Sequence, residues 1–248
     1  MKGTFFNKQI EWNIETTGES WFQGDTLKGV LKVKNHGLES VDFTDSGVSL
    51  SLGEIKKVQA RAENALKIEQ TKKLENSNLN SGATIEVPFS FQIDPNAAVT
   101  DKKLSYYLSF GRNFNESQLQ VKISPKPLFT KIVGLLDTFY RFKLKEFKTA
   151  KKGVEFKFIP PTSREMANIE SLLLTFSMEG SDLSMIFNFQ VKKLDTSSVT
   201  TKLNKESLFI KKELTPKEYS LGPDMINQDH ILNCLEKVLS EVKLRNVF

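Results

Sequence analysis

Apolar and polar residues alternate along short segments of this chain, and this alternation limits the folds that are open to it. The clearest segment runs from Ile85 to Ile93, where every second residue is apolar and the residues between are polar or proline. Successive side chains of a β-strand point to opposite faces of its sheet, so the pattern predicts a strand with one buried face. Pro88 has no backbone N–H for the ladder, which places this strand at a sheet edge or at a bulge.

The same alternation recurs in both halves of the chain. A length of 248 residues exceeds most single cores and fits two β-sandwiches of roughly 100–120 residues each. We therefore predict an all-β fold of two tandem β-sandwich domains. The other expected strands lie at residues 27–34, 48–52, 104–110, 119–123, 154–158, 172–178, 183–191 and 208–211.

Two prolines mark a boundary between the halves. Pro125 and Pro127 flank a lysine and favour an extended, semi-rigid connection. Apolar residues then recur at helical spacing from Leu128 to Phe139, which predicts a short helix that fills the space between the domains. The expected organisation is an N-terminal sandwich (1–125), a linker with a short helix (126–140), a C-terminal sandwich (141–222) and a C-terminal amphipathic helix (223–248).

Two polar segments carry weaker signals. Residues 54–81 predict a long exposed hairpin, with a helix over residues 60–67 as the alternative. Residues 195–205 are rich in serine and threonine and predict a loop.

The tail changes from a period of two to a helical period. Its apolar residues fall at i, i+4, i+7 and i+11, which places them on one stripe of a helix. Such a stripe docks on its own domain, or it forms a contact with a second copy or another partner. The residues of this stripe are Ile231, Leu235, Val238 and Val242.

The net charge of +5 is concentrated between residues 141 and 157, where only Glu146 and Glu155 oppose a run of basic residues. One interpretation is a solvated hairpin, because lysines shield sheet edges from unwanted pairing. The other is a binding surface for an acidic protein partner or an anionic lipid surface. Nucleic acid is not expected, since no exposed aromatic residues alternate with the basic ones. The candidate contact residues are Lys143, Lys145, Lys148, Lys151 and Lys152.

The residues needed for catalysis are scarce. His36 lies in a predicted turn, and His230 with Cys234 supplies only half of a tetrahedral metal site. The chain has no glycine-rich phosphate-binding loop. We therefore predict a non-enzymatic protein with no catalytic residues, no cofactor and no bound metal.

Cysteine usage and the N-terminal residues suggest a location. A single cysteine cannot form an internal disulfide, which suits a reducing compartment. The first residues include no apolar segment of the kind a signal peptide needs, and the apolar runs fall short of the ~18 residues of a membrane span. The expected location is the cytoplasm.

Several motifs resemble the arrestin fold. The segment from Trp21 to Leu31 (WFQGDTLKGVL) is similar to the family's aromatic, glycine, acidic and strand pattern, in which Gly24 would supply a turn and Gly29 a bulge or a close approach. The segments from Val87 to Ile93 and from Tyr106 to Leu108 resemble a second family pattern. The strand, Pro-x-Pro and short helix from residue 119 to 139 resemble the linker of the bacterial sporulation-control branch, and the likeness covers roughly residues 12–192.

This resemblance implies two β-sandwiches and a role in protein–protein contacts. Sporulation is not carried over, because the chain is basic where that branch is expected to be acidic and its tail helix lies outside the likeness. The leading hypothesis is an intracellular adaptor or regulatory scaffold that presents sheet edges, the concavity between its domains and the basic hairpin, with strand addition as a mode of binding. The alternatives are a peripheral membrane protein that uses the same lysines, an oligomeric structural protein that uses the tail stripe, and, last, a carbohydrate-binding or hydrolytic sandwich.

Overall fold

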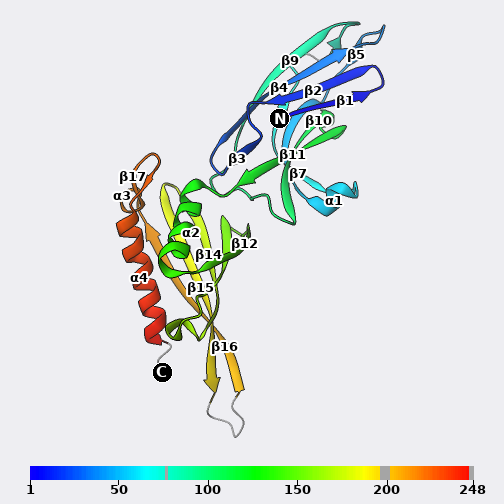
Figure 1. Cartoon of the computed structure of the whole chain (residues 1–248). Helices are drawn as coiled ribbons and strands as arrows, with labels where there is room; N and C mark the ends of the chain where they lie inside the picture. Colours follow the sequence, from blue (N-terminus) through cyan, green and yellow to red (C-terminus); the bar gives the residue numbers. More distant parts are fainter. Residues whose placement is uncertain (76–77, 196–201, 246–248) are drawn as a thin grey trace. The chain divides into compact units, whose positions relative to one another are not determined.

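The chain forms two compact units, Met1–Ser124 and Pro125–Phe248 (Figure 1). The computed structural model describes residues 1–75, 78–195 and 202–245. Each unit has its own sheets and its own buried side chains.

The first unit is a sandwich of two main sheets. One sheet has the strand order β1-β2-β4-β9 and the other the order β3-β11-β10-β6-β7. A small pair, β5 with β8, joins two of the loops. The elements are β1 (Lys2–Asn7), β2 (Ile10–Thr16), β3 (Ser20–Phe22), β4 (Thr26–Asn35), β5 (Val41–Asp42), β6 (Ser46–Glu54), α1 (Ile55–Gln59), β7 (Leu66–Lys73), β8 (Asn78–Leu79), β9 (Thr84–Gln92), β10 (Leu104–Arg112) and β11 (Ser117–Ser124).

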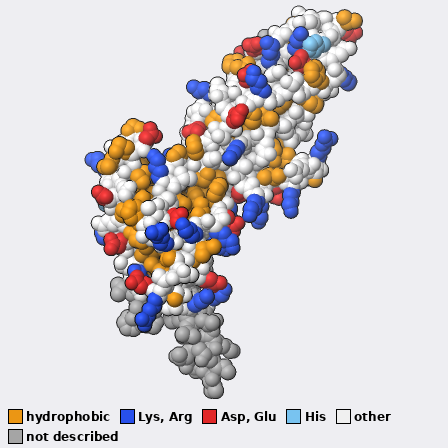
Figure 2. Space-filling model, viewed as in Figure 1, with side chains coloured by type: hydrophobic (Ala, Val, Ile, Leu, Met, Phe, Trp, Pro, Cys, Tyr) orange, Lys and Arg blue, Asp and Glu red, His pale blue; other side chains and the backbone are white. Residues whose placement is uncertain are grey.

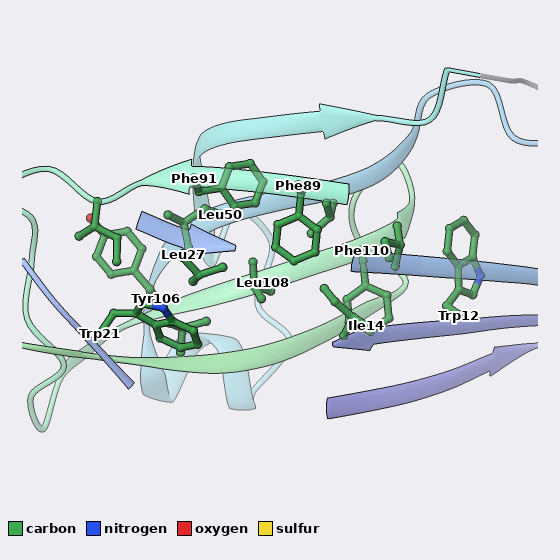
Figure 3. Packing of buried hydrophobic residues seen from close by; sticks show 14 of the residues in the cluster. Trp12, Ile14, Trp21, Leu27, Leu50, Phe89, Phe91, Tyr106, Leu108 and Phe110 are labelled. Atoms are coloured by element: carbon green, nitrogen blue, oxygen red, sulfur yellow. The ribbon is translucent and has the colours of Figure 1, made fainter. Parts of the chain in front are cut away.

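Alternating apolar residues from both sheets form the core of this unit. Trp12 and Phe89 come from one sheet, and Leu108 and Phe110 come from the other (Figure 3). The alternation of residues 85–93 corresponds to β9, whose buried side chains are every second residue. This confirms the predicted strand and its buried face.

The predicted roles of two glycines are confirmed. Gly24 has a φ of 91° in the turn before β4, a conformation that glycine adopts without steric cost. Gly29 lies opposite Phe89 in the β4–β9 ladder, and a Cβ at Gly29 would lie 2.4 Å from Phe89 Cζ. Gly29 therefore leaves the space that the Phe89 ring occupies.

The edge strand β9 is closed along part of its free edge. Ile93 N–H donates to Asp25, so by alternation the backbone N–H groups of the even-numbered residues point away from β4. Pro88 is one of these residues, and its missing N–H costs no ladder bond. This confirms the expectation that Pro88 lies on an edge strand.

Gln70 of β7 binds the same edge from the other sheet. Its side-chain amide donates to Gln92 O at 2.7 Å and accepts from Gln92 N at 3.2 Å. These are the two bonds that a residue of a neighbouring strand makes in an antiparallel sheet. The Gln70 side chain thus ties the edges of the two sheets together.

The polar segment after β6 contains a short helix and two strands. Helix α1 covers Ile55–Gln59 and is followed by β7, which pairs with β6 as the expected hairpin does. The helix lies before residues 60–67, which were the alternative site for it.

The second unit has one main sheet with the order β12-β13-β14-β15-β16. The remaining strands, β17 and β18, form a separate pair. The elements are α2 (Pro127–Tyr140), β12 (Lys143–Thr149), β13 (Val154–Ile159), a 3-10 turn (Arg164–Met166), β14 (Ile169–Glu179), β15 (Asp182–Asp195), β16 (Lys202–Leu214), α3 (Pro216–Tyr219), β17 (Ser220–Gly222), β18 (Met225–Ile226) and α4 (Gln228–Arg245).

Helices supply the layer that packs on this sheet. Phe129 of α2 stacks on Phe176 of β14 with a centroid distance of 5.0 Å. The Tyr140 hydroxyl donates to Leu232 O at 3.2 Å, which joins α2 to α4. The all-β fold class is confirmed, but in the described part of this unit helices stand where a second sheet was expected. The alternation along β13 to β15 marks one buried face and does not specify what covers it.

Two expectations about connections need correction. Helix α2 packs on the sheet of the second unit through Phe129, so it is part of that unit and not only a linker. Residues 202–205, expected in a loop, lie in β16, which pairs with β15 from Lys202 to Leu214. Alternating polar residues at an edge strand resemble loop composition, and residues 196–201 lie outside the described residues.

We predict that Gly29→Ala destabilises the first unit. The new Cβ would lie 2.5 Å from the backbone oxygen of Glu15 as well as against Phe89, and a backbone atom cannot give way easily. The expected loss is about 1–3 kcal/mol of unfolding free energy. Both tryptophans, Trp12 and Trp21, lie in this unit, so tryptophan fluorescence during urea unfolding reports it selectively.

Gly134→Ala is the matched control for this prediction. Gly134 lies in α2 and no atom is within 4 Å of its added Cβ. The tryptophan transition should not move in this variant. An unchanged midpoint in Gly29→Ala would mean that the packing of Phe89 does not need the glycine.

Candidate interaction surface

The basic stretch forms the hairpin of β12 and β13 at one edge of the second sheet. Ala150 N–H donates to Gly153 O at 3.1 Å and closes the turn, in which Gly153 has a φ of 75°. A side chain is excluded at Gly153, since its Cβ would lie 1.9 Å from Phe176 O. The turn thus holds the hairpin against the neighbouring strand β14.

The structure brings the five candidate lysines together on this hairpin. Lys143 binds Asp137 of α2 at 2.6 Å, and Lys148 binds Glu155 of β13 at 2.9 Å. The remaining three lysines are exposed, and no carboxylate of the described residues lies within ion-pair distance of them. These three, Lys145, Lys151 and Lys152, are called the unpaired lysines below.

The two faces of β12 differ in chemistry. The register pairs Glu146 with Lys157 and Lys148 with Glu155, so these side chains share the outer face of the sheet. Phe147 pairs with Phe156 and shares the inner face, on which α2 packs. The register shifts between Leu144 and Glu146, which makes Lys145 the extra residue of a β-bulge.

Exposed apolar side chains were not part of the predicted site. Leu144 is 43% exposed, Phe147 37% and Phe139, near the end of α2, 51%. In the view of Figure 2, hydrophobic side chains reach the surface of the second unit among lysines and acidic residues. The alternation of Leu144 and Phe147 is interrupted by the bulge at Lys145, so a strict period of two did not reveal that both belong to the inner face.

Phe147 is the outer end of a row of aromatic rings. Its centroid lies 5.8 Å from that of Phe156, which lies 5.5 Å from Phe176 in an edge-to-face arrangement. Phe176 in turn stacks on Phe129 of α2. The row is buried except at Phe147, where the sheet ends.

The tail stripe is not an exposed contact. Ile231, Leu235, Val238 and Val242 each have 0% exposure in α4. The stripe docks on its own unit, and the alternative of a contact with a second copy through these side chains is wrong, because the fold already buries them completely. The spacing predicted the helix and its apolar face but not the surface that covers it.

The histidines and the cysteine have ordinary protein environments. His36 Nε2 lies 2.7 Å from Glu11 Oε2, and His230 Nε2 lies 3.6 Å from Glu218 Oε1. Burial raises the pKa of the Cys234 thiol. Within the described ranges, no three His, Cys, Asp or Glu side chains are placed to share a metal ion.

The fold of the chain is arrestin-like. Among solved structures it is similar to Spo0M, a sporulation control protein from Bacillus subtilis, with a TM-score of 0.63 and 14% sequence identity over 95% of this chain and 99% of that chain. A β-glucosidase from Listeria innocua in complex with gluconolactone gives a TM-score of only 0.28 at 12% identity, over 48% of this chain and 17% of that chain. At 14% sequence identity, the likeness to Spo0M shows that the two chains share a fold.

Other comparisons gave no match. No family model and no curated protein matches the sequence. Of the described helices, none combines the length and the apolar character that crossing a membrane requires.

We predict that Leu235→Ala destabilises the second unit without changing its association state. Removal of a fully buried leucine costs about 2–5 kcal/mol. The loss should appear in thermal unfolding followed by circular dichroism, whereas sedimentation velocity should give the same species as the parent chain. Asn233→Ala, at an exposed position of the same helix, is the control. A changed association state at unchanged stability would restore the stripe as an intermolecular contact.

Proposed function

We propose that this chain is a non-enzymatic intracellular adaptor or regulatory scaffold that acts by binding another protein. The observation that carries the proposal is the arrestin-like fold, which extends over 95% of the chain at a TM-score of 0.63. The matched structure is described as a sporulation control protein, a regulatory role. We place the protein in the cytoplasm because its single cysteine suits a reducing compartment.

The β12–β13 hairpin is the proposed contact surface. Its unpaired lysines carry positive charge that the described residues do not neutralise locally. Such a patch attracts an acidic partner and speeds the encounter, more strongly at low ionic strength. Acidic side chains on the partner would complete the ion pairs that these lysines lack.

A protein partner is favoured over a lipid surface by the side chains around the lysines. Glu146 and Glu155 lie among them on the hairpin, and a folded partner can place a basic group opposite each of them, whereas an anionic membrane presents negative charge at every position. The exposed Phe147 lies on an edge strand of the sheet, where a polypeptide can pair through its own backbone groups as well as its side chains.

We predict that reversing the charge of the three unpaired lysines abolishes partner binding. The variant Lys145→Glu, Lys151→Glu, Lys152→Glu should lose, in affinity capture from cells that express the protein, the acidic proteins that the parent chain retains. Repulsion replaces attraction at each position, so an effect of about tenfold or more is expected. Quantitative mass spectrometry of the captured proteins provides the measurement.

A control variant carries the same change of charge elsewhere. Lys56→Glu, Lys67→Glu, Lys122→Glu alters three exposed lysines of the first unit and should retain the partners. If both variants capture the same proteins as the parent, the hairpin is not the contact surface. If only flotation with anionic vesicles, and not protein capture, depends on the unpaired lysines, the ligand is a lipid surface.

A further inference from the structure

The geometry of β12 points to a specific mode of binding. We propose that its free edge takes up an extended peptide as an added β-strand, with an apolar side chain beside Phe147, an acidic side chain on the Lys148 side of it and a basic side chain on the Glu146 side. This inference rests on the proposed function and adds to it the backbone conformation and the side-chain pattern of the partner.

Backbone groups are directed toward this edge. Strand β12 pairs only with β13 among the described strands. Ala150 N–H points toward β13, so by alternation the N–H and C=O of Phe147 point the other way, into the position of a further strand. Residues 143–149 include no proline, so each residue of β12 has an N–H group.

The edge of β9 in the first unit shows what a closed edge looks like in this chain. At β9 the Gln70 amide occupies both backbone groups of Gln92, and Pro88 lacks the donor that would face an added strand. Neither device is present at Phe147, which the bulge at Lys145 precedes by two residues. The sequence therefore blocks the edge of β9 but not the edge of β12 at Phe147, although each of these strands ends a sheet.

The side chains beside Phe147 define the apolar position of the peptide. Phe147 ends the row of rings that runs through Phe156 and Phe176 to α2. A residue of an added strand directly opposite Phe147 would extend this row by one position on the inner face. Apolar surface of Phe147 that is now in water would be covered, which favours binding.

The neighbouring positions of the peptide would lie on the outer face. On one side of Phe147 they would face Lys148 and the unpaired lysines at the turn, and on the other side they would face Glu146. Opposite charges directly across two strands stabilise their pairing, whereas like charges oppose it. The expected ligand is thus a segment in which apolar residues alternate with charged ones, basic opposite Glu146 and acidic from Lys148 toward the turn. Such an alternation has high β-propensity when the apolar residues are β-branched.

The test uses the full chain and a short fluorescent peptide in which valine alternates with charged residues, with lysine opposite Glu146 and glutamate at the other charged positions. Binding is followed by fluorescence anisotropy, and exchange of the Phe147 amide proton is followed by NMR. We expect binding that weakens with salt and slower exchange at Phe147 in the complex. A peptide of the same composition with the valines in one block has the same charge and should bind about tenfold more weakly.

Methylation of the peptide backbone separates strand addition from attraction by charge. A strand has two edges, and only one of them can face β12. Methylating alternate backbone nitrogens on one edge should abolish binding, while methylating those on the other edge should preserve it. Equal binding of both methylated peptides would overturn the proposal.

Two variants of the chain test whether the outward backbone N–H of Phe147 is needed for binding. Phe147→Pro removes the outward N–H, as Pro88 does in β9, and leaves the bonds to β13 in place. Phe147→Ala loses the same ring but keeps the N–H, so the proline variant should bind the peptide about threefold to tenfold more weakly than the alanine variant. Circular dichroism of both variants checks that the sheet is retained.

Failure of this inference differs from failure of the proposed function. If the unpaired lysines govern capture of a cellular protein but no peptide shows an edge-specific effect of methylation, the adaptor remains and strand addition is wrong. If charge reversal affects neither the capture nor the peptide, both are wrong. Binding of anionic vesicles with no binding of the peptide would also overturn strand addition.

Discussion

Burial of one apolar face of each sheet is the constraint on which the rest of the structure depends. In the first unit two sheets cover each other, and Trp12, Phe89 and Leu108 meet between them. In the second unit α2 and α4 cover a single sheet, through contacts such as the stacking of Phe129 on Phe176. The same alternation of apolar and polar residues thus occurs in a sheet that another sheet covers and in a sheet that helices cover. Because each unit buries its own face, its edge strands are left to face solvent or another chain.

The edges are where the two units differ most. In the first unit a side-chain amide and a proline occupy positions of β9 at which another strand would bind. In the second unit β12 ends the sheet with lysines, a bulge and an exposed aromatic ring. Lysines and bulges are common protections against aggregation, and the aromatic ring is not. Edge protection alone therefore does not account for the exposed ring at β12, and the proposed contact with a peptide rests on it.

Much of the fold could be predicted from the sequence, because a period of two or of 3.6 directly encodes which residues share a face. The strand at 85–93 and the tail helix with Leu235 on its buried face follow from this rule. The covering layers could not be predicted, since burial of Leu235 does not say against what it is buried. In α2 the apolar stripe was expected to run from Leu128 to Phe139, but Phe139 is exposed, and Phe129 stacks on Phe176 of the sheet. The lysines of the hairpin were evident from composition, but their ion pairs with Asp137 and Glu155 depend on contacts that only the fold creates.

The amide of Gln70 has a consequence for the ageing of the protein. It contacts one donor and one acceptor of Gln92 at once, which only a group with both functions can do. Deamidation would convert it to a carboxylate, which accepts hydrogen bonds but donates none. One oxygen would still receive the Gln92 N–H, while the other would face the Gln92 carbonyl with no proton between them. A single hydrolytic event at this side chain would thus loosen the tie between β7 and β9 and leave the Gln92 carbonyl of β9 without its donor.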